Sequence, residues 1–430
     1  MRGGRRRVPR REFEMIIKRD RYLTALINRM HNGLVKVVTG IRRSGKSFLI
    51  FNLFQSYLKE NGVDADHIIA LELDDRRNRE YRDPDALLRY IDSRMTDGGE
   101  YYILLDEVQE AEHFEEVLNS LLHLPNADVY VTGSNSKFLS KDVVTEFRGR
   151  GDEVHIFPLS FQEFMQVFPG DVYHGWADYI TYGGLPYVAA VKTEEQKTRY
   201  LTNLFSEVYI RDVVERYRIE KTQELNDLID VLASSIGALT NPAKIEATFK
   251  SVMKSSLTAY TVRQYIERLE EAFIISAARR YDVKGRKYIG SPMKYYFEDH
   301  GLRNARLRFR QVEESHLMEN VIYNELRLRG YLVDVGVVDE RRTSNGVSER
   351  KRYEIDFVAN QGSKRYYIQS ALAMPDADKE AREKYSLRAV GDSFKKIVVV
   401  KDVVNVRRDE TGVTTVNLYD FLLNENSLDL

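Results

Sequence analysis

The chain has 430 residues, of which 65 are Lys or Arg and 66 are Asp or Glu, and it contains no cysteine. Its length predicts about two to four domains. The lack of cysteine excludes a disulfide framework, a thiolate zinc site and a cysteine nucleophile. No apolar run approaches the ~20 residues that span a bilayer, and the basic N-terminus leads into no apolar segment. We therefore expect a cytoplasmic protein without a membrane span.

The net charge of −1 argues against a chain that is basic throughout, but it leaves room for a local basic face. Residues 1–19 begin with a run rich in arginine. We interpret them as a solvated basic arm, and a contact with nucleic acid is the alternative.

Residues 20–160 alternate between β-rich and helical segments. The β-rich segments lie at 34–40, 67–75, 101–107 and 128–135. Helical patterns lie between them, at 47–62, 83–95 and 113–124. In the second of these helices, Asp83 is a predicted N-cap and Pro84 takes the first helical position. Strands that alternate with helices indicate an α/β fold with a parallel, doubly wound sheet.

The pattern changes after residue 160. Residues 161–221 are predicted to be a helical lid or linker. Residues 222–310 are predicted to form three helices followed by strand-like pieces, which is the outline of a winged helix. Residues 311–430 predict a small α/β domain, with helices at 313–329 and 376–389 and strands at 331–338, 353–359, 365–371 and 396–400. The charged stretch 339–352 is predicted to be an exposed loop.

A phosphate-binding motif follows the first predicted strand. The sequence Gly40-Ile41-Arg42-Arg43-Ser44-Gly45-Lys46-Ser47 matches G-x-x-x-x-G-K-[ST], with a predicted helix after it. Glycines let successive backbone N–H groups face the phosphates, and the helix N-terminus favours the same anion. We expect Lys46 to reach the β- and γ-phosphates of ATP and the Ser47 hydroxyl to ligate Mg²⁺.

Two acidic residues end the strand predicted at 101–107. We expect Asp106 to hold Mg²⁺ opposite Ser47, and Glu107 to polarise the attacking water. The next strand ends in polar residues that can sense the γ-phosphate or orient the water, although each of them also fits a plain turn. These residues are Thr132, Ser134 and Asn135.

Arg148 and Arg150 follow that strand. A guanidinium that reaches the site of a neighbouring subunit stabilises transition-state charge, so these residues are candidate arginine fingers in a homo-oligomer. An ordinary surface arginine is the alternative for either position.

With these motifs in place, the chain resembles prokaryotic AAA+ type P-loop ATPases that carry a winged helix and a C-terminal domain similar to PD-(D/E)xK nucleases. The resemblance rests on the segments GIRRSGKS, YYILLDEVQE, VTGSN, FRGRGDEVHIFPLSFQEF, YGGLPY, YIRDVVERY, YYFEDHGLRNA, ENVIYNEL, EIDFVA and YIQSAL. It implies Mg²⁺-dependent binding and hydrolysis of ATP. It also favours Arg150 over Arg148 as the arginine finger and suggests Arg211 as a lid arginine.

Nucleases of that fold need a helix glutamate, a strand aspartate and a Glu-x-Lys on the next strand. The resemblance places Glu319 and Asp356 at the first two positions, but the third position reads Gln369-Ser370-Ala371. Glutamine is a weak ligand for a hard cation, and alanine cannot activate water. We therefore expect an inactive domain, although Glu354 shares a strand face with Asp356 and could compensate.

The segment from Arg279 to Arg310 is strongly basic. It holds ten Lys or Arg against three Asp or Glu, a net charge of +7, with tyrosines interleaved. A wing hairpin of this charge could grip DNA phosphates. A basic face between domains, or one for a protein client, is the alternative.

The chemistry of these motifs supports one main function. We expect an ATP-hydrolysing switch or motor that acts on DNA or on a protein partner. A nucleotide-binding regulator with incidental turnover is the first alternative, and an ATP-dependent nuclease is the second.

Overall fold

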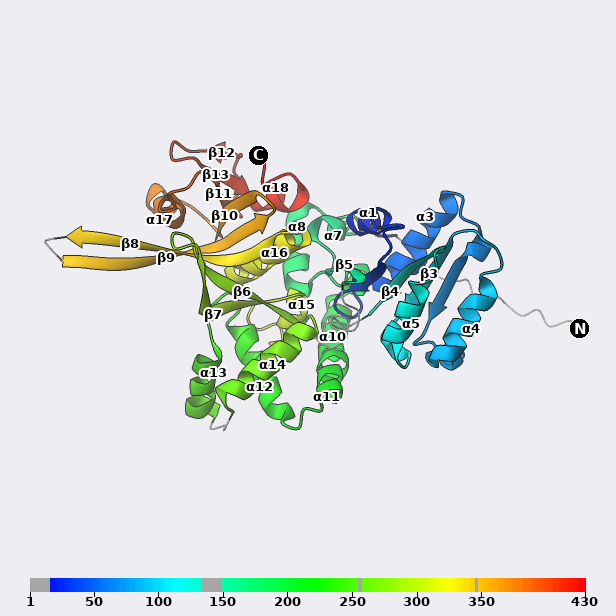
Figure 1. The fold of residues 1–430 in the computed structure, drawn as a ribbon. Helices are drawn as coiled ribbons and strands as arrows, with labels where there is room; N and C mark the ends of the chain where they lie inside the picture. The colour runs from blue at the N-terminus through cyan, green and yellow to red at the C-terminus, as the bar shows by residue number, and fades with distance from the viewer. Residues whose placement is uncertain (1–15, 134–148, 254–256, 345–346) are drawn as a thin grey trace, which may run out of the picture.

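The computed structural model describes residues 16–133, 149–253, 257–344 and 347–430. Figure 1 shows a parallel sheet flanked by helices at one end, a helical middle, and a second sheet at the other end, from which one long hairpin projects. Within these ranges no helix is long and apolar enough to cross a membrane.

The first sheet has five parallel strands in the order β2-β3-β4-β1-β5. They are β1 Val35–Thr39, β2 Ile68–Glu72, β3 Tyr101–Asp106, β4 Ala127–Thr132 and β5 Gly151–His155. Around them lie α1 Asp20–Ile27, α2 Lys46–Phe48, η1 Leu49–Phe54, α3 Gln55–Glu60, η2 Ala65–His67, η3 Arg76–Arg82, α4 Pro84–Arg94, η4 Val108–Glu110 and α5 Phe114–Leu121. The predicted α/β class is confirmed. So is the Asp83 cap, whose carboxylate accepts the Ala86 N–H at 2.9 Å.

Both faces of this sheet are buried, which explains why its inner strands are apolar throughout. Ile103 and Leu105 of β3 pack with α4 and α5 in one cluster, whereas Tyr102 and Leu104 pack with α1 and α3 in another. The edge strand β5 escapes prediction because only Val154 in it is buried, and an edge strand leaves one side to solvent.

The middle of the chain is helical. Its first half contains α7 Phe161–Met165, α8 Val172–Tyr182, α9 Pro186–Ala190, α10 Glu194–Leu204, η6 Phe205–Ile210 and α11 Arg211–Tyr217. Its second half contains α12 Thr222–Ser234, α13 Pro242–Thr248, η7 Phe249–Met253 and α14 Ala259–Glu271. An antiparallel hairpin of β6 Ile275–Asp282 and β7 Lys287–Phe297 follows, and then α15 His300–Arg306.

The second sheet is mixed and has the order β12-β13-β11-β10-β9-β8-β6-β7. Its remaining elements are α16 Glu314–Leu328, β8 Leu332–Ser344, β9 Val347–Gln361, β10 Lys364–Ala371, α17 Ala377–Arg388, β11 Lys395–Val400, β12 Arg407–Arg408, β13 Val413–Asn417 and α18 Leu418–Leu423. The hairpin joins this sheet because β6 pairs in parallel with β8, with Tyr281 opposite Gly336. The sheet therefore continues across the boundary that the sequence suggests at residue 310.

The prediction of a loop at 339–352 is wrong. Residues 339–344 and 347–352 extend β8 and β9 into the long hairpin that projects in Figure 1. The register places Asp339 opposite Arg352 and Glu340 opposite Lys351, and Asp339 forms an ion pair with Arg352 at 3.0 Å. Because opposite charges across a ladder stabilise the pairing, a charged segment without apolar alternation forms strands here.

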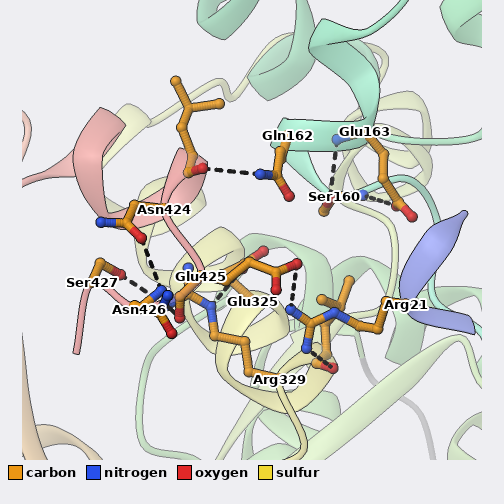
Figure 2. Close-up of polar contacts among 12 residues, drawn as sticks. Arg21, Ser160, Gln162, Glu163, Glu325, Arg329, Asn424, Glu425, Asn426 and Ser427 are labelled. Carbon is orange, nitrogen blue, oxygen red and sulfur yellow. Dashed lines mark hydrogen bonds and ion pairs between the residues drawn. The ribbon is translucent and has the colours of Figure 1, made fainter. Parts of the chain in front are cut away.

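The C-terminal end packs back against α1 and α16, as Figure 2 shows. The buried Arg329 guanidinium binds Glu325 at 2.7 Å and Ser427 Oγ at 2.9 Å. Arg21 of α1 pairs with Glu425 at 2.9 Å. The last strands and helices are thereby tied to the part of the chain that carries the first sheet.

Two glycines allow backbone segments around the helical middle to touch each other directly. A Cβ at Gly301 would lie 2.0 Å from Tyr182 O, and one at Gly184 would lie 2.3 Å from Leu159 O. The buried Asp299 carboxylate accepts the Gly184 N–H at 2.8 Å. The contact is backbone to backbone, so neither position has room for a side chain.

A buried carboxylate also joins the first sheet to α16. Glu298, with a side chain 1% exposed, forms ion pairs with His155 at the end of β5 and with Arg327 of α16. His155 Nδ1 lies 3.0 Å from Thr39 Oγ1 at the end of β1. Burial by itself raises the pKa of Glu298, but His155 and Arg327 outweigh it, so the pKa is lowered.

We expect Gly301→Ala to destabilise the protein by about 1–3 kcal/mol or more, because the new Cβ meets a backbone carbonyl. Gly391→Ala is the matched control, since an added Cβ there has nothing within 4 Å, and it should cost about 0.5 kcal/mol or less. Chemical denaturation followed by Trp176 fluorescence measures both. Equal denaturation midpoints for the two variants would contradict the close packing.

We expect Glu298→Gln to lower stability by about 3–5 kcal/mol at neutral pH, because it removes the buried charge that pairs with the partly buried Arg327 and with His155. The folded-state pKa of Glu298 lies below the ordinary value of 4.5, so its contribution is present above pH 4.5 and is lost as the pH falls through the folded value. Denaturation of wild type and variant over a pH series tests this, with the exposed Glu60→Gln as control. If the difference in stability between wild type and Glu298→Gln does not decrease at acidic pH, the proposed contribution of these ion pairs is contradicted.

Candidate nucleotide site

The loop after β1 has the backbone geometry of an anion cradle. Gly40 and Gly45 adopt φ values of 139° and 99°, and Arg43 between them adopts 64°. Glycine reaches such values without steric cost. A Cβ at Gly40 would also lie 2.2 Å from Ile156 O, just beyond β5. Packing against the neighbouring strand and the shape of the loop therefore both require glycine at this position.

A helix begins at Lys46 and runs through α2, η1 and α3 to Glu60, so its N-terminus faces the loop. Its buried face packs against the sheet through Leu49, Ile50, Phe54 and Leu58. Lys46 Nζ donates to Gly40 O at 3.0 Å and to Ile41 O at 3.2 Å. Burial lowers the pKa of Lys46, and the nearby Glu107 and Asp106 carboxylates oppose that change.

The ends of β3 and β4 bring the predicted acidic residues to this helix. The Thr132 hydroxyl donates to Asp106 Oδ1 and accepts the Glu107 N–H at 2.9 Å. The Ser47 hydroxyl forms a further hydrogen bond to Asp106. Burial raises the pKa of Asp106, and the bonds from Thr132 and Ser47 oppose the rise. Lys46, Ser47, Asp106, Glu107 and Thr132 therefore lie at one edge of the sheet.

Glu107 itself is held by a neighbour that sequence reasoning missed. Its φ of 46° is unusual for a residue other than glycine. Gln109 Nε2 donates to Glu107 Oε2, which fixes the direction of the carboxylate. The signal in the sequence is a glutamine two residues after the glutamate that ends the strand.

Two further side chains hold the loop from outside, and neither was predicted. Arg19, just before α1, donates to Ser44 O at 3.0 Å, and Tyr209 of η6 donates to Arg42 O at 2.5 Å. Arg42 Nη2 lies 3.5 Å from Asp212 Oδ1. The helical middle therefore contacts the phosphate loop directly, a fact that depends on tertiary packing and leaves no local signature.

Arg211, which the resemblance suggests as a lid arginine, does not contact the loop. Its side chain is exposed and pairs with Glu215 at 2.7 Å. The neighbouring residues Tyr209 and Asp212 reach the loop instead, because they lie on the inner side of the helix.

A cleft of about 720 Å³ opens beside the loop. Arg43, Tyr187 and Tyr200 line it, and the rings of Tyr187 and Tyr200 lie 4.4 Å apart. Arg43 Nη1 donates to the Tyr200 hydroxyl at 3.1 Å. The cleft thus offers aromatic faces and a cation next to the residues predicted to bind phosphate.

The remaining candidates lie elsewhere. Arg150 is exposed at the start of β5 and donates to Asn119 Oδ1 at 2.7 Å. The parallel strand places it at the amino edge of the sheet, roughly 16 Å from the edge that carries the loop. Ser134, Asn135 and Arg148 lie outside the described residues.

The donor set of the site fits a magnesium nucleotide. The buried Ser44 Oγ has no hydrogen-bond partner, and the Ser47 hydroxyl and Asp106 carboxylate offer the hard oxygen ligands that Mg²⁺ prefers. In the described part of the chain, no group of three or more His, Asp or Glu side chains is arranged to hold a metal by itself. Phosphate oxygens would therefore have to complete the coordination.

The basic segment from Arg279 to Arg310 does not form one face. Lys294 and Arg303 are buried, and Arg306 pairs with Asp230 at 2.5 Å. The cations left exposed are Arg279, Lys284, Arg286, Lys287, Arg308 and Arg310. A count of charges along the sequence cannot separate cations that face solvent from those with internal partners.

A protein-family model covers the residues of this site. The model of the AAA domain family matches residues 32–165, which include β1 to β5 and the loop. A domain of unknown function (DUF8612) matches residues 173–313. Among solved structures, similarity is found to the Aeropyrum pernix ORC1 protein in complex with DNA (TM-score 0.28, 14% identity, 67% of this chain and 91% of that one). The Cdc6p protein from Pyrobaculum aerophilum is also similar (TM-score 0.30, 12% identity, 72% and 97%).

Two curated relatives match over most of their length. An uncharacterized protein of Methanocaldococcus jannaschii is 25% identical over 393 residues, which cover 88% of this chain and 82% of the relative. An uncharacterized protein of Haemophilus influenzae is 31% identical over 414 residues, which cover 95% of this chain and 99% of the relative. The chain therefore belongs to the same family as this Haemophilus influenzae protein, and its first sheet is an AAA domain with the α/β fold of P-loop ATPases.

Proposed function

We propose that the protein binds ATP with Mg²⁺ and hydrolyses it, and that it works as a nucleotide-driven switch or motor. The observation that carries the proposal is the meeting of Lys46, Ser47, Asp106 and Glu107 at the edge of a parallel sheet where a helix N-terminus faces a glycine loop. In such a site a phosphate chain meets backbone N–H groups, a buried ammonium and metal-binding oxygens together.

Each residue has a distinct role in this proposal. Lys46 would bind the β- and γ-phosphates, and Ser47 and Asp106 would hold Mg²⁺, which neutralises phosphate charge when it is bound. Glu107 would orient the attacking water and accept its proton. Gln109, through its bond to Glu107, would keep that carboxylate turned toward the water.

The cleft beside Arg43 supports a place for the nucleoside. An aromatic pair of Tyr187 and Tyr200 offers stacking surface to a base, and the guanidinium beside it adds a cation–π partner. Because Arg43 of the loop lines this cleft, a base held there would lie close to the phosphates.

The downstream parts are the proposed output of the switch. We assign residues 222–310 to a winged helix and residues 311–430 to a nuclease-like domain without nuclease activity. A DNA contact would use the exposed hairpin tip, with Lys284, Arg286 and Lys287, since exposed cations supply phosphate binding. The exposed side of α14 carries both Arg263 and Glu267. Because the glutamate would repel phosphates, the tip of the β6–β7 hairpin is the better candidate for a DNA contact than this helix. A protein client remains the alternative partner.

We expect Lys46→Ala to reduce ATP turnover by at least about 10²-fold, because it removes a preorganised cation from the phosphates. Glu107→Gln should retain ATP binding and lose about 10²–10⁴-fold in kcat, as expected when a general base is removed. Phosphate release and nucleotide titrations measure the two effects. Lys59→Ala and Glu112→Gln, both exposed, are the matched controls.

The same assay separates hydrolysis from regulation by binding alone. If wild type turns over ATP no faster than Lys46→Ala, the proposed hydrolytic activity is contradicted. The protein would then be a regulator that acts through nucleotide binding alone. Normal turnover by Glu107→Gln would contradict the role given to that carboxylate.

The position of Arg150 supports action in a homo-oligomer. Because Arg150 lies at the opposite edge of the sheet from its own loop, it could act as an arginine finger only at the site of another chain. Arg148 is the second candidate for this role.

We expect a mixture of Lys46→Ala and Arg150→Ala chains to be more active than either variant alone. Each mixed interface can combine an intact site with an intact arginine, so random assembly should restore about a quarter of wild-type turnover. A control mixture of Lys46→Ala with the Lys46→Ala/Arg150→Ala double variant should stay inactive. No recovery in the test mixture would count against Arg150 acting between subunits.

A further inference from the structure

Three carboxylates of the C-terminal part surround one ammonium that comes from the preceding hairpin. Lys294 Nζ of β7 lies 2.8 Å from Glu319 Oε1 of α16, 2.7 Å from Glu354 Oε1 of β9 and 3.7 Å from Asp356 Oδ1 of β9. The lysine side chain is 3% exposed, and those of Glu319 and Asp356 are 14% and 11% exposed. The sequence comparison with nucleases named all three acids, with Glu354 as a possible compensating residue, but it assigned no cation from the chain to them.

We infer that the Lys294 ammonium is the resident cation of this carboxylate cluster, in place of the divalent metal that the nuclease resemblance implies. The cluster is then an internal set of ion pairs that ties β7 of the β6–β7 hairpin to α16 and β9. This inference is independent of ATP binding and hydrolysis.

The space for a metal is already filled. Mg²⁺ requires oxygen ligands at about 2.0–2.1 Å in an octahedron. An ammonium within hydrogen-bond distance of Glu319 and Glu354 occupies the volume between those oxygens and repels a second cation. Gly237 also lies near the cluster, because a Cβ there would lie 3.2 Å from both Glu319 carboxylate oxygens.

The other bonds of the cluster also suit a structural role. The Tyr296 hydroxyl donates to Glu319 Oε1 at 2.5 Å, and the Ser370 N–H donates to Asp356 Oδ2 at 2.8 Å. These donors orient the carboxylates around the ammonium. Burial by itself lowers the pKa of Lys294, but the surrounding carboxylates outweigh it and raise the pKa, so the side chain stays charged.

These ion pairs have a mechanical consequence. Four residues beyond Lys294, the same chain segment reaches Glu298, which pairs with His155 at the end of β5. The segment 294–298 is thus fixed by ion pairs at both ends. Movement of the hairpin away from α16 would leave Lys294 and Glu319 without their ion-pair partner, which costs several kcal/mol for a buried ion.

The test is Mn²⁺ binding to the nucleotide-free full-length protein, followed by the electron paramagnetic resonance signal of free Mn²⁺. All variants carry Asp106→Asn, which removes the predicted metal ligand of the nucleotide site. We expect no Asp356-dependent binding in this background. Adding Lys294→Met should vacate the cluster and create one Mn²⁺ site with a Kd of about 10⁻⁴–10⁻³ M, typical of weak oxygen-ligand sites. Further addition of Asp356→Asn should abolish that site.

Thermal unfolding is an independent measurement, and it also shows whether a variant is folded. Lys294→Met should unfold at a lower temperature than Lys287→Met, an exposed lysine of the same strand, and Mn²⁺ should raise the midpoint of Lys294→Met alone. Lys294→Arg keeps a cation in the cluster and should remain folded and unable to bind Mn²⁺.

Two results would overturn the inference. One is Mn²⁺ binding that depends on Asp356 in protein that retains Lys294. The other is cleavage of DNA by the wild-type chain with Mn²⁺ that disappears in Asp356→Ala. Neither measurement depends on ATP turnover, so a failure here is distinguishable from a failure of the proposed ATPase.

Discussion

The buried Glu298 carboxylate is the interaction on which the arrangement of the molecule depends. It lies immediately after β7 and pairs with His155 at the end of β5 and with Arg327 of α16. His155 in turn lies against Thr39, the residue directly before the phosphate loop. A charge this deeply buried is tolerated only with partners in place. These ion pairs therefore fix the positions of the first sheet, the β6–β7 hairpin and α16 relative to one another. The close backbone contacts at Gly184 and Gly301 restrict their movement further.

The candidate nucleotide site is also in direct contact with the helical middle of the chain. Arg19 and Tyr209, from opposite flanks of the AAA domain, donate to carbonyls of the phosphate loop. A ligand that changes the loop therefore changes contacts with the helical middle, and only such differential contacts can shift a conformational equilibrium. β7 extends this connection toward the C-terminal sheet, because its downstream end carries Glu298 while Lys294 ties it to the carboxylates of α16 and β9.

Much of the fold can be predicted from the sequence. The parts that cannot be predicted have specific physical reasons. The inner strands of the first sheet are apolar on both faces, and the loop motif, with Asp106 and Glu107, is local in sequence, so both could be predicted. The strand β5 and the hairpin arms at 339–352 were missed because their pairing is satisfied by backbone bonds and cross-strand charges rather than by apolar periodicity. Gln109 was overlooked although its spacing from Glu107 is short, and Arg19 and Tyr209 are remote from the loop in sequence.

Sequence alone determined the motif of the loop after β1, since its glycines, lysine and serine lie at a fixed local spacing before an adjoining helix. It also determined the balance of charge, but not where that charge lies. Only the tertiary structure decided that Lys294 and Arg303 are internal, that Lys294 meets Glu319 and Glu354, and that the hairpin belongs to the C-terminal sheet. The physical reason is that an ion pair depends on the distance between the two charges in space. Partners separated by 25 residues or more along the chain become neighbours only through folding.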